Sequence, residues 1–142
     1  DAPKVFVDTN VLLYAFDTSA AGKRRLALAV VREAWRGGTG CVSVQVLQEF
    51  YVNATRKLER PVTVDTATRI VASLSHWEVH APDANDVLSA IVLQRSAQLS
   101  FWDAMVVTSA QAMGCELLYS EDLNAGQSIG GVTVVNPFAG RP

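Results

Sequence analysis

Four acidic residues, far apart along the chain, lie where a predicted parallel sheet would have its ligand-binding edge. They are Asp8, Glu49, Asp103 and Asp122. Carboxylates gathered in one place repel one another, and burial strengthens that repulsion. A fold that gathers them is best explained by a bound cation, and ligands that are all oxygen favour a hard ion such as Mg²⁺ or Mn²⁺. The pattern therefore predicts a metal-dependent enzyme that acts on phosphate esters.

Three of these residues also have an ordinary structural explanation. Asp8 directly follows an apolar run and could cap the next helix. Glu49 could be a solvated helix residue, and Asp122 could be a turn residue. Glu121 is adjacent to Asp122 and could share or replace its role. Four independent accidents are a weaker explanation than a single site, because all four positions fall at the same expected edge of the sheet.

Asp103 comes three residues after Ser100, at the expected start of a helix. This S-x-x-D spacing predicts that Ser100 caps the helix and that Asp103 completes a variant of the capping box. The positive end of the helix would keep Asp103 ionised and ready for a cation. We expect Phe101 and Trp102 to pack beneath Asp103 and to fix its position.

Short apolar strands alternate with helices along the chain, and these elements must position the acidic residues. Strands are expected at about 5–7, 40–42, 77–80, 116–119 and 132–135, and helices at about 11–15, 21–36, 44–58, 64–74, 84–93 and 101–113. Asp17 to Ser19 should break the first helix and offer a cap to the second. The alternation predicts a three-layer α/β/α sandwich with a central parallel sheet. The ligand site of such a sheet lies beyond the carboxyl ends of its strands.

The composition indicates one globular domain, residues 1–142, with a net charge of −2. This charge excludes a polycation that coats nucleic acid, so any nucleic-acid binding must rely on local patches and on the metal. No apolar run approaches the ~20 residues that cross a membrane. The chain starts without a signal peptide or an initiator Met, which suggests processing. Cys41 and Cys115 fit small buried residues in a reducing cytoplasm.

Four segments of the chain resemble the PIN domain, and within it the VapC-type toxins of bacterial toxin–antitoxin pairs. In order, they are Val7–Leu12, Gln48–Tyr51, Phe101–Ala104, and Ser120–Asn124 with Gly126 and Gln127. The start D-T-N is weak evidence alone, but all four segments in sequence are a strong match. The resemblance covers essentially the whole chain, with Ser120 where many relatives have Thr.

The resemblance implies a Mg²⁺- or Mn²⁺-dependent endoribonuclease with one or two ions and an acidic quartet of Asp8, Glu49, Asp103 and Asp122. It implies that Thr9 and Asn10 support Asp8 by hydrogen bonds, and that Ser120 keeps a hydroxyl in place. It further implies a homodimer that is held inactive by a small antitoxin. The expected reaction is cleavage of RNA phosphodiester bonds by metal-activated water.

Two basic clusters are candidate RNA contacts. Lys23, Arg24 and Arg25 start one helix, whereas Arg56, Lys57 and Arg60 lie at the end of another. They could form a phosphate path into the acidic pocket, or they could be solvated helix ends, with Arg56, Lys57 and Arg60 complementing a helix dipole.

Two other functions compete with the nuclease. A Mg²⁺-dependent phosphoryl-transfer or receiver-like domain also places an Asp at a strand end. However, a phosphoryl-transfer enzyme of the haloacid-dehalogenase type would need a second Asp two residues after Asp8, and Asn10 is there. A receiver domain would need a Lys after a later strand, and no Lys follows Lys57. A non-catalytic RNA- or protein-binding module, whose carboxylates only cap helices, would bind no metal.

Overall fold

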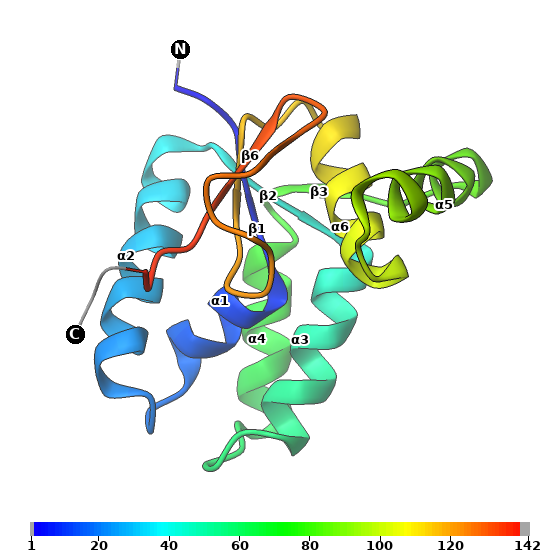
Figure 1. Cartoon of the computed structure of the whole chain (residues 1–142). Coiled ribbons are helices and arrows are strands. Elements are labelled where there is room, and N and C mark those ends of the chain that lie inside the picture. The colour runs from blue at the N-terminus through cyan, green and yellow to red at the C-terminus, as the bar shows by residue number, and fades with distance from the viewer. Residues whose placement is uncertain (1, 140–142) are drawn as a thin grey trace.

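Six strands form one sheet at the centre of the molecule (Figure 1). The computed structural model describes residues 2–139. The strands are β1 (Val5–Val7), β2 (Gly40–Ser43), β3 (Glu78–His80), β4 (Leu117–Tyr119), β5 (Ser128–Ile129) and β6 (Val132–Val135), in the order β3-β2-β1-β4-β6-β5. All neighbouring pairs are parallel except β5 and β6, which are antiparallel.

Helices cover the sheet on both sides, so the predicted three-layer α/β/α sandwich is confirmed. The helices are α1 (Thr9–Phe16), α2 (Ala21–Gly37), α3 (Val44–Arg56), α4 (Val64–Leu74), α5 (Ala84–Ala97) and α6 (Phe101–Ala112). Figure 1 shows α2 on one side of the sheet and the packed pair α5 and α6 on the other. Within residues 2–139, no helix combines the length and the apolar character that a membrane-spanning segment needs.

The central strand β1 is buried along its whole length. Phe6 and Val7 are fully buried, and so is Leu118 on the neighbouring strand β4. A strand with helices on both faces has no solvent-facing side, which explains why β1 reads as an unbroken apolar run. Val7 pairs with Tyr119, so the residues after these two strands emerge side by side at the same edge of the sheet.

Three local expectations were wrong. Strand β5 was not expected, although Gly130 and Gly131 both have positive φ (55° and 88°) and form the two-residue loop of a β-hairpin. Helix α1 begins at Thr9 rather than at residue 11, because Asp8 is its N-cap. Asp17 does not cap α2; its side chain accepts hydrogen bonds from the backbone and hydroxyl of Ser19.

Candidate active site

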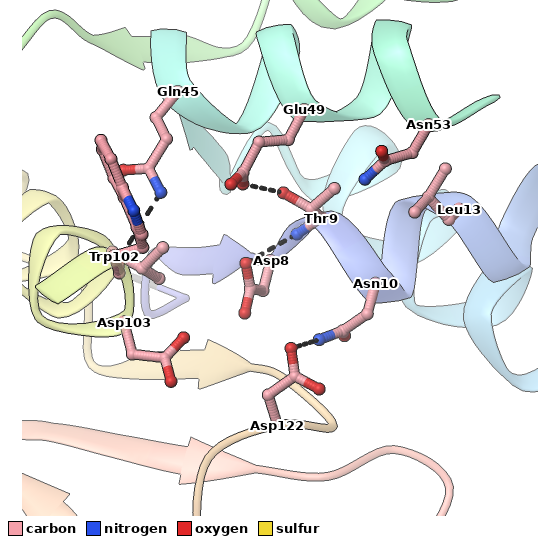
Figure 2. A pocket seen from close by; sticks show the side chains of 11 residues that line it. Asp8, Thr9, Asn10, Leu13, Gln45, Glu49, Asn53, Trp102, Asp103 and Asp122 are labelled. Atoms are coloured by element: carbon pink, nitrogen blue, oxygen red, sulfur yellow. Dashed lines mark hydrogen bonds between the residues drawn. The ribbon is translucent and has the colours of Figure 1, made fainter. Parts of the chain in front are cut away.

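A pocket of about 180 Å³ opens beyond the carboxyl ends of β1, β2 and β4. All four predicted acidic residues line it, although they come from four separate segments of the chain. Figure 2 shows their carboxylates facing a common space. The other residues of the lining are Thr9, Asn10, Leu13, Gln45, Asn53, Trp102 and Val106.

Asp8 is the most deeply placed of the four, with a side chain that is only 5% exposed. It is both the residue after β1 and the N-cap of α1, so its role as a helix cap is compatible with its position in the pocket. One carboxylate oxygen accepts from the Thr9 backbone N–H at 2.7 Å, and the other accepts from the Ser120 hydroxyl at 2.8 Å. Burial, together with the charges of Asp122 and Asp103, raises the pKa of Asp8 to about 6 against these two hydrogen bonds.

Glu49 lies on the face of α3 that forms one wall of the pocket. Gln45, Glu49 and Asn53 follow one another at intervals of four residues, so they share that face of the helix. The Thr9 hydroxyl donates to Glu49 Oε1 at 2.8 Å. Glu49 is therefore tied to the start of α1 and is not a freely solvated glutamate.

Asp103 enters the pocket from the first turn of α6, but half of its predicted capping box is missing. The Ser100 hydroxyl accepts from the Asp103 backbone N–H at 3.1 Å, as predicted. The return bond from the Ser100 backbone to the Asp103 carboxylate does not form, so that carboxylate is left to face the pocket. Burial raises the pKa of Asp103, the Ser100 hydroxyl opposes this, and the charge of Asp122 adds to it.

The packing expected beneath Asp103 is only half correct. Phe101 is partly buried against the cluster of Ala90, Ala104 and Met105. The side chain of Trp102, in contrast, is 61% exposed at the mouth of the pocket.

Asp122 lies in the loop after β4 and is held by Asn10. The Asn10 amide nitrogen donates to Asp122 Oδ2 at 2.9 Å, and its oxygen accepts from the Glu121 backbone N–H at 3.1 Å. The Asp122 backbone N–H also donates to the Ser120 hydroxyl at 3.2 Å. Asn10 thus supports Asp122 and not Asp8, whereas Ser120 connects the two acidic residues.

Glu121 does not line the pocket. Its carboxylate forms an ion pair with Lys23 and accepts from the Tyr14 hydroxyl at 3.1 Å. The Lys23 ammonium also lies 4.7 Å from the centre of the Tyr14 ring. Glu121 therefore fastens the Asp122 loop to α1 and α2, and the expectation that it could replace Asp122 is wrong.

The basic residues fall into two groups. Lys23 is engaged by Glu121, and neither Arg24 nor Arg25 lines the acidic pocket. Lys57 lines a second pocket of about 310 Å³, which shares Asn10, Leu13 and Asn53 with the first. Arg56 and Arg60 are exposed and line neither of these two pockets.

The donors in the acidic pocket suit a hard divalent cation, because they are carboxylate and amide oxygens. Within residues 2–139, however, no three Asp, Glu, His or Cys side chains stand close enough together to hold a metal ion. Mg²⁺ usually keeps several of its waters and takes only one or two carboxylates directly. The residues present therefore fit a partly hydrated cation better than a complete shell of carboxylates.

Sequence reasoning missed five pocket residues as site residues: Leu13, Gln45, Asn53, Trp102 and Val106. The four-residue spacing of Gln45 and Asn53 around Glu49 was an available signal. Trp102 gave none, because a tryptophan beside an apolar helix start reads as a core residue.

Comparison with known proteins identifies the family. The PIN domain model matches residues 5–127. A toxin–antitoxin complex from Klebsiella pneumoniae has a similar structure, with a TM-score of 0.72 and 23% identity over 94% of this chain and 98% of that one.

Two further solved structures share the fold. VapC20 from Mycobacterium tuberculosis, a toxin that cleaves the Sarcin-Ricin loop, has a TM-score of 0.59 and 19% identity, covering 84% of this chain and 90% of its own. DNA-bound VapBC2 from Rickettsia felis has a TM-score of 0.63 and 14% identity, covering 92% and 96%. No curated protein matches significantly. Since the family model spans most of the sequence, the chain belongs to the PIN domain family.

Proposed function

We propose that this chain is a Mg²⁺- or Mn²⁺-dependent endoribonuclease and the toxin of a toxin–antitoxin pair. The observation that carries the proposal is the meeting of Asp8, Glu49, Asp103 and Asp122 in one pocket at the carboxyl edge of the sheet. The raised pKa of Asp8, to which the charges of Asp122 and Asp103 contribute, supports it, because a site that crowds negative charge benefits from a cation.

The four carboxylates have different parts in this proposal. Asp8 and Asp103 would hold the cation directly, since both are anchored at helix starts. Glu49 and Asp122 would complete its surroundings directly or through water, held in place by Thr9 and Asn10. Once bound, the cation would neutralise the phosphate and supply a water of lowered pKa for hydrolysis. One or two ions are compatible with this arrangement.

Partners follow from the same proposal. The similar structures include toxin–antitoxin complexes, which supports a cognate antitoxin. We also propose a homodimer. Helix α5 leaves four apolar side chains more than one third exposed, which gives a candidate contact surface: Val87, Leu88, Ile91 and Val92.

The proposed domain is the single unit 1–142, and the proposed location is the cytoplasm. The cytoplasm contains the proposed RNA substrate, and its reducing conditions keep the free buried thiols of Cys41 and Cys115 reduced.

Cleavage of total RNA tests the proposal. The chain is incubated with RNA and Mg²⁺ or Mn²⁺, beside an Asp8→Ala variant, and the new 5′ ends are mapped. We expect discrete metal-dependent ends from the original chain and none from the variant. Full cleavage by Asp8→Ala or by Asp8→Asn would remove Asp8 from its proposed role.

Thermal melting separates the nuclease from a non-catalytic binding module. A ligand that binds only the folded state raises the melting temperature, so Mn²⁺ should stabilise the original chain and should stabilise Asp8→Asn much less. A module whose carboxylates only cap helices would show the same melting temperature with and without Mn²⁺.

Incubation with acetyl phosphate tests the receiver-like alternative, which predicts a phosphorylated aspartate.

A further inference from the structure

Trp102 exposes a large aromatic ring beside the proposed catalytic carboxylates. Its side chain is 61% exposed, and the next residue in the chain is Asp103. Single exposed apolar side chains are common on proteins, so exposure alone means little. The position of Trp102 is informative, because this residue lines the same pocket as all four acidic residues. Figure 2 shows its ring at the Gln45 end of that pocket.

The ring is supported on one side by Phe101, and its backbone is bonded by Gln45. Phe101 packs against it edge to face, with ring centres 5.1 Å apart and an angle of 74° between the planes. Phe101 itself packs against the cluster of Ala90, Ala104 and Met105, and so gives the indole a fixed support. The Gln45 amide also donates to the Trp102 backbone carbonyl at 3.5 Å. A ring fixed in advance loses little conformational entropy when a ligand binds.

The walls around the ring are polar. Apart from Trp102, Leu13 and Val106, every residue that lines the pocket has a polar or charged side chain. A partner protein that docks through apolar contacts needs a continuous apolar patch, which this pocket does not offer. A nucleotide matches it better, since it combines a flat π-face with a phosphate and polar edges.

We propose that Trp102 is a stacking platform for the nucleobase next to the scissile phosphate. This inference rests on the proposed ribonuclease function. With the phosphate held at the carboxylates by the bound cation, a neighbouring base would reach the indole. The Gln45 side chain lies beside the ring. In an RNA duplex the neighbouring bases cover both faces of each base, so none is free to stack on the indole. The substrate class is therefore single-stranded RNA, such as a loop or an unpaired end.

The proposal also orients the RNA along α3. Gln45, Glu49 and Asn53 line the pocket in order, with Trp102 beside Gln45 and the second pocket, with Lys57, beyond Asn53. The stacked base thus lies on the Gln45 side of the scissile phosphate, and the next phosphate lies toward Lys57.

Steady-state cleavage of a single-stranded RNA oligonucleotide, taken around a mapped cleavage site, tests the inference. Loss of one base–aromatic stack should raise the KM of Trp102→Leu about tenfold, with kcat little changed. Trp102→Phe keeps a π-face and should recover most of the loss. Trp35→Leu, at a tryptophan that is 47% exposed and outside the acidic pocket, is the matched control and should keep the original KM. Melting curves check that the variants fold.

Abasic substitution tests the same contact from the side of the RNA. Removing the base beside the scissile bond should raise the KM of the original chain, but should not raise that of Trp102→Leu any further. If the original chain cleaves RNA and Trp102→Leu has the same KM, the stacking proposal is wrong while the nuclease proposal stands.

A binding measurement decides the question even without turnover. Stacking on Trp102 should quench tryptophan fluorescence when oligouridylate is added, and Trp102→Leu should lose that quenching. A chain that cleaves no RNA contradicts the proposed function, and a chain whose fluorescence is unchanged by oligouridylate contradicts the stacking inference. If Trp102→Leu loses affinity only for a protein partner, the stacking inference also fails.

Discussion

The Thr9 hydroxyl donates a hydrogen bond of 2.8 Å to Glu49 Oε1 and so connects the start of α1 to the wall formed by α3. The backbone N–H of the same threonine donates to Asp8 at 2.7 Å. One residue therefore orients two of the four proposed metal-binding carboxylates.

Thr9→Val should weaken the site without unfolding the chain, because valine keeps the shape and the backbone bond but loses the hydroxyl. A hydrogen bond to a charged group contributes roughly 1.5–3 kcal/mol, so cleavage should fall by about tenfold or more. RNA cleavage rates and the Mn²⁺ concentration at half-maximal activity measure the effect. Thr55→Val is the control, because the Thr55 hydroxyl bonds only to backbone carbonyls of α3. Equal losses in both variants would contradict a special role for Thr9.

The stability of the metal-free protein should fall as the pH rises from about 4 to above 6. The ordinary pKa of Asp8, 3.8, is raised to about 6 in the folded chain, so the folded state binds the proton more tightly than the unfolded state. The stabilisation from this proton is present in full below pH 3.8 and is lost through pH 6. The shift corresponds to roughly 3 kcal/mol, and Asp103 contributes in the same direction.

Chemical denaturation in EDTA across this pH range measures the loss. Asp8→Asn removes the titrating group and should flatten the curve. Asp83→Asn is a useful comparison because the pKa of Asp83 is lowered, through its bond with the Asp86 backbone, so its contribution is lost as the pH falls. A variant Asp8→Asn with an unchanged pH dependence would show that Asp8 does not titrate in this range.

Lys57 and Lys23 should differ in RNA binding. Lys57 lines the pocket next to the acidic site, whereas Lys23 is paired with Glu121. Lys57→Ala should therefore flatten the plot of log affinity against log salt concentration by about one unit, and Lys23→Ala should leave the slope as it was. A changed slope in Lys23→Ala alone would move the RNA path to the other side of the pocket.

Gly40→Ala should destabilise the fold. A Cβ atom at this position would lie 2.6 Å from the ring of Trp77, so the ring must move and the core around β2 must repack. Overpacking of this kind costs roughly 1–3 kcal/mol, which a denaturation midpoint detects. Gly22→Ala is the matched control, because nothing lies within 4 Å of its added Cβ in α2. That variant should be at least as stable as the original chain, because alanine narrows the unfolded ensemble and meets no neighbour.

Most of the fold could be predicted because strands and helices leave periodic patterns. The buried run Val5–Val7 and the caps Ser43 and Asp83 were readable, and the structure has them where the sequence placed them. Strand β5 was missed because two residues are too few to show an alternating pattern.

The contents of the acidic pocket were predictable, but the links between its residues were not. Asp8 and Asp122 follow strands, Asp103 lies in the first turn of α6 and Glu49 in the second turn of α3, and the topology then brings them to one edge. The hydrogen-bond partner of each side chain depends on the direction in which that side chain points, and the spacing of residues in the sequence does not encode this direction. Asn10 therefore proved to hold Asp122, and Glu121 proved to face Lys23.

The bonds from Ser120 to Asp8 and from Asn10 to Asp122 each join residues 112 positions apart. A polypeptide still growing on the ribosome, and not yet extended past β4, has the first three segments of the pocket but neither of these links. The RNA cleavage proposed for this molecule therefore requires that the chain be synthesised at least as far as Asp122, which gives an antitoxin translated at the same time an interval in which to bind.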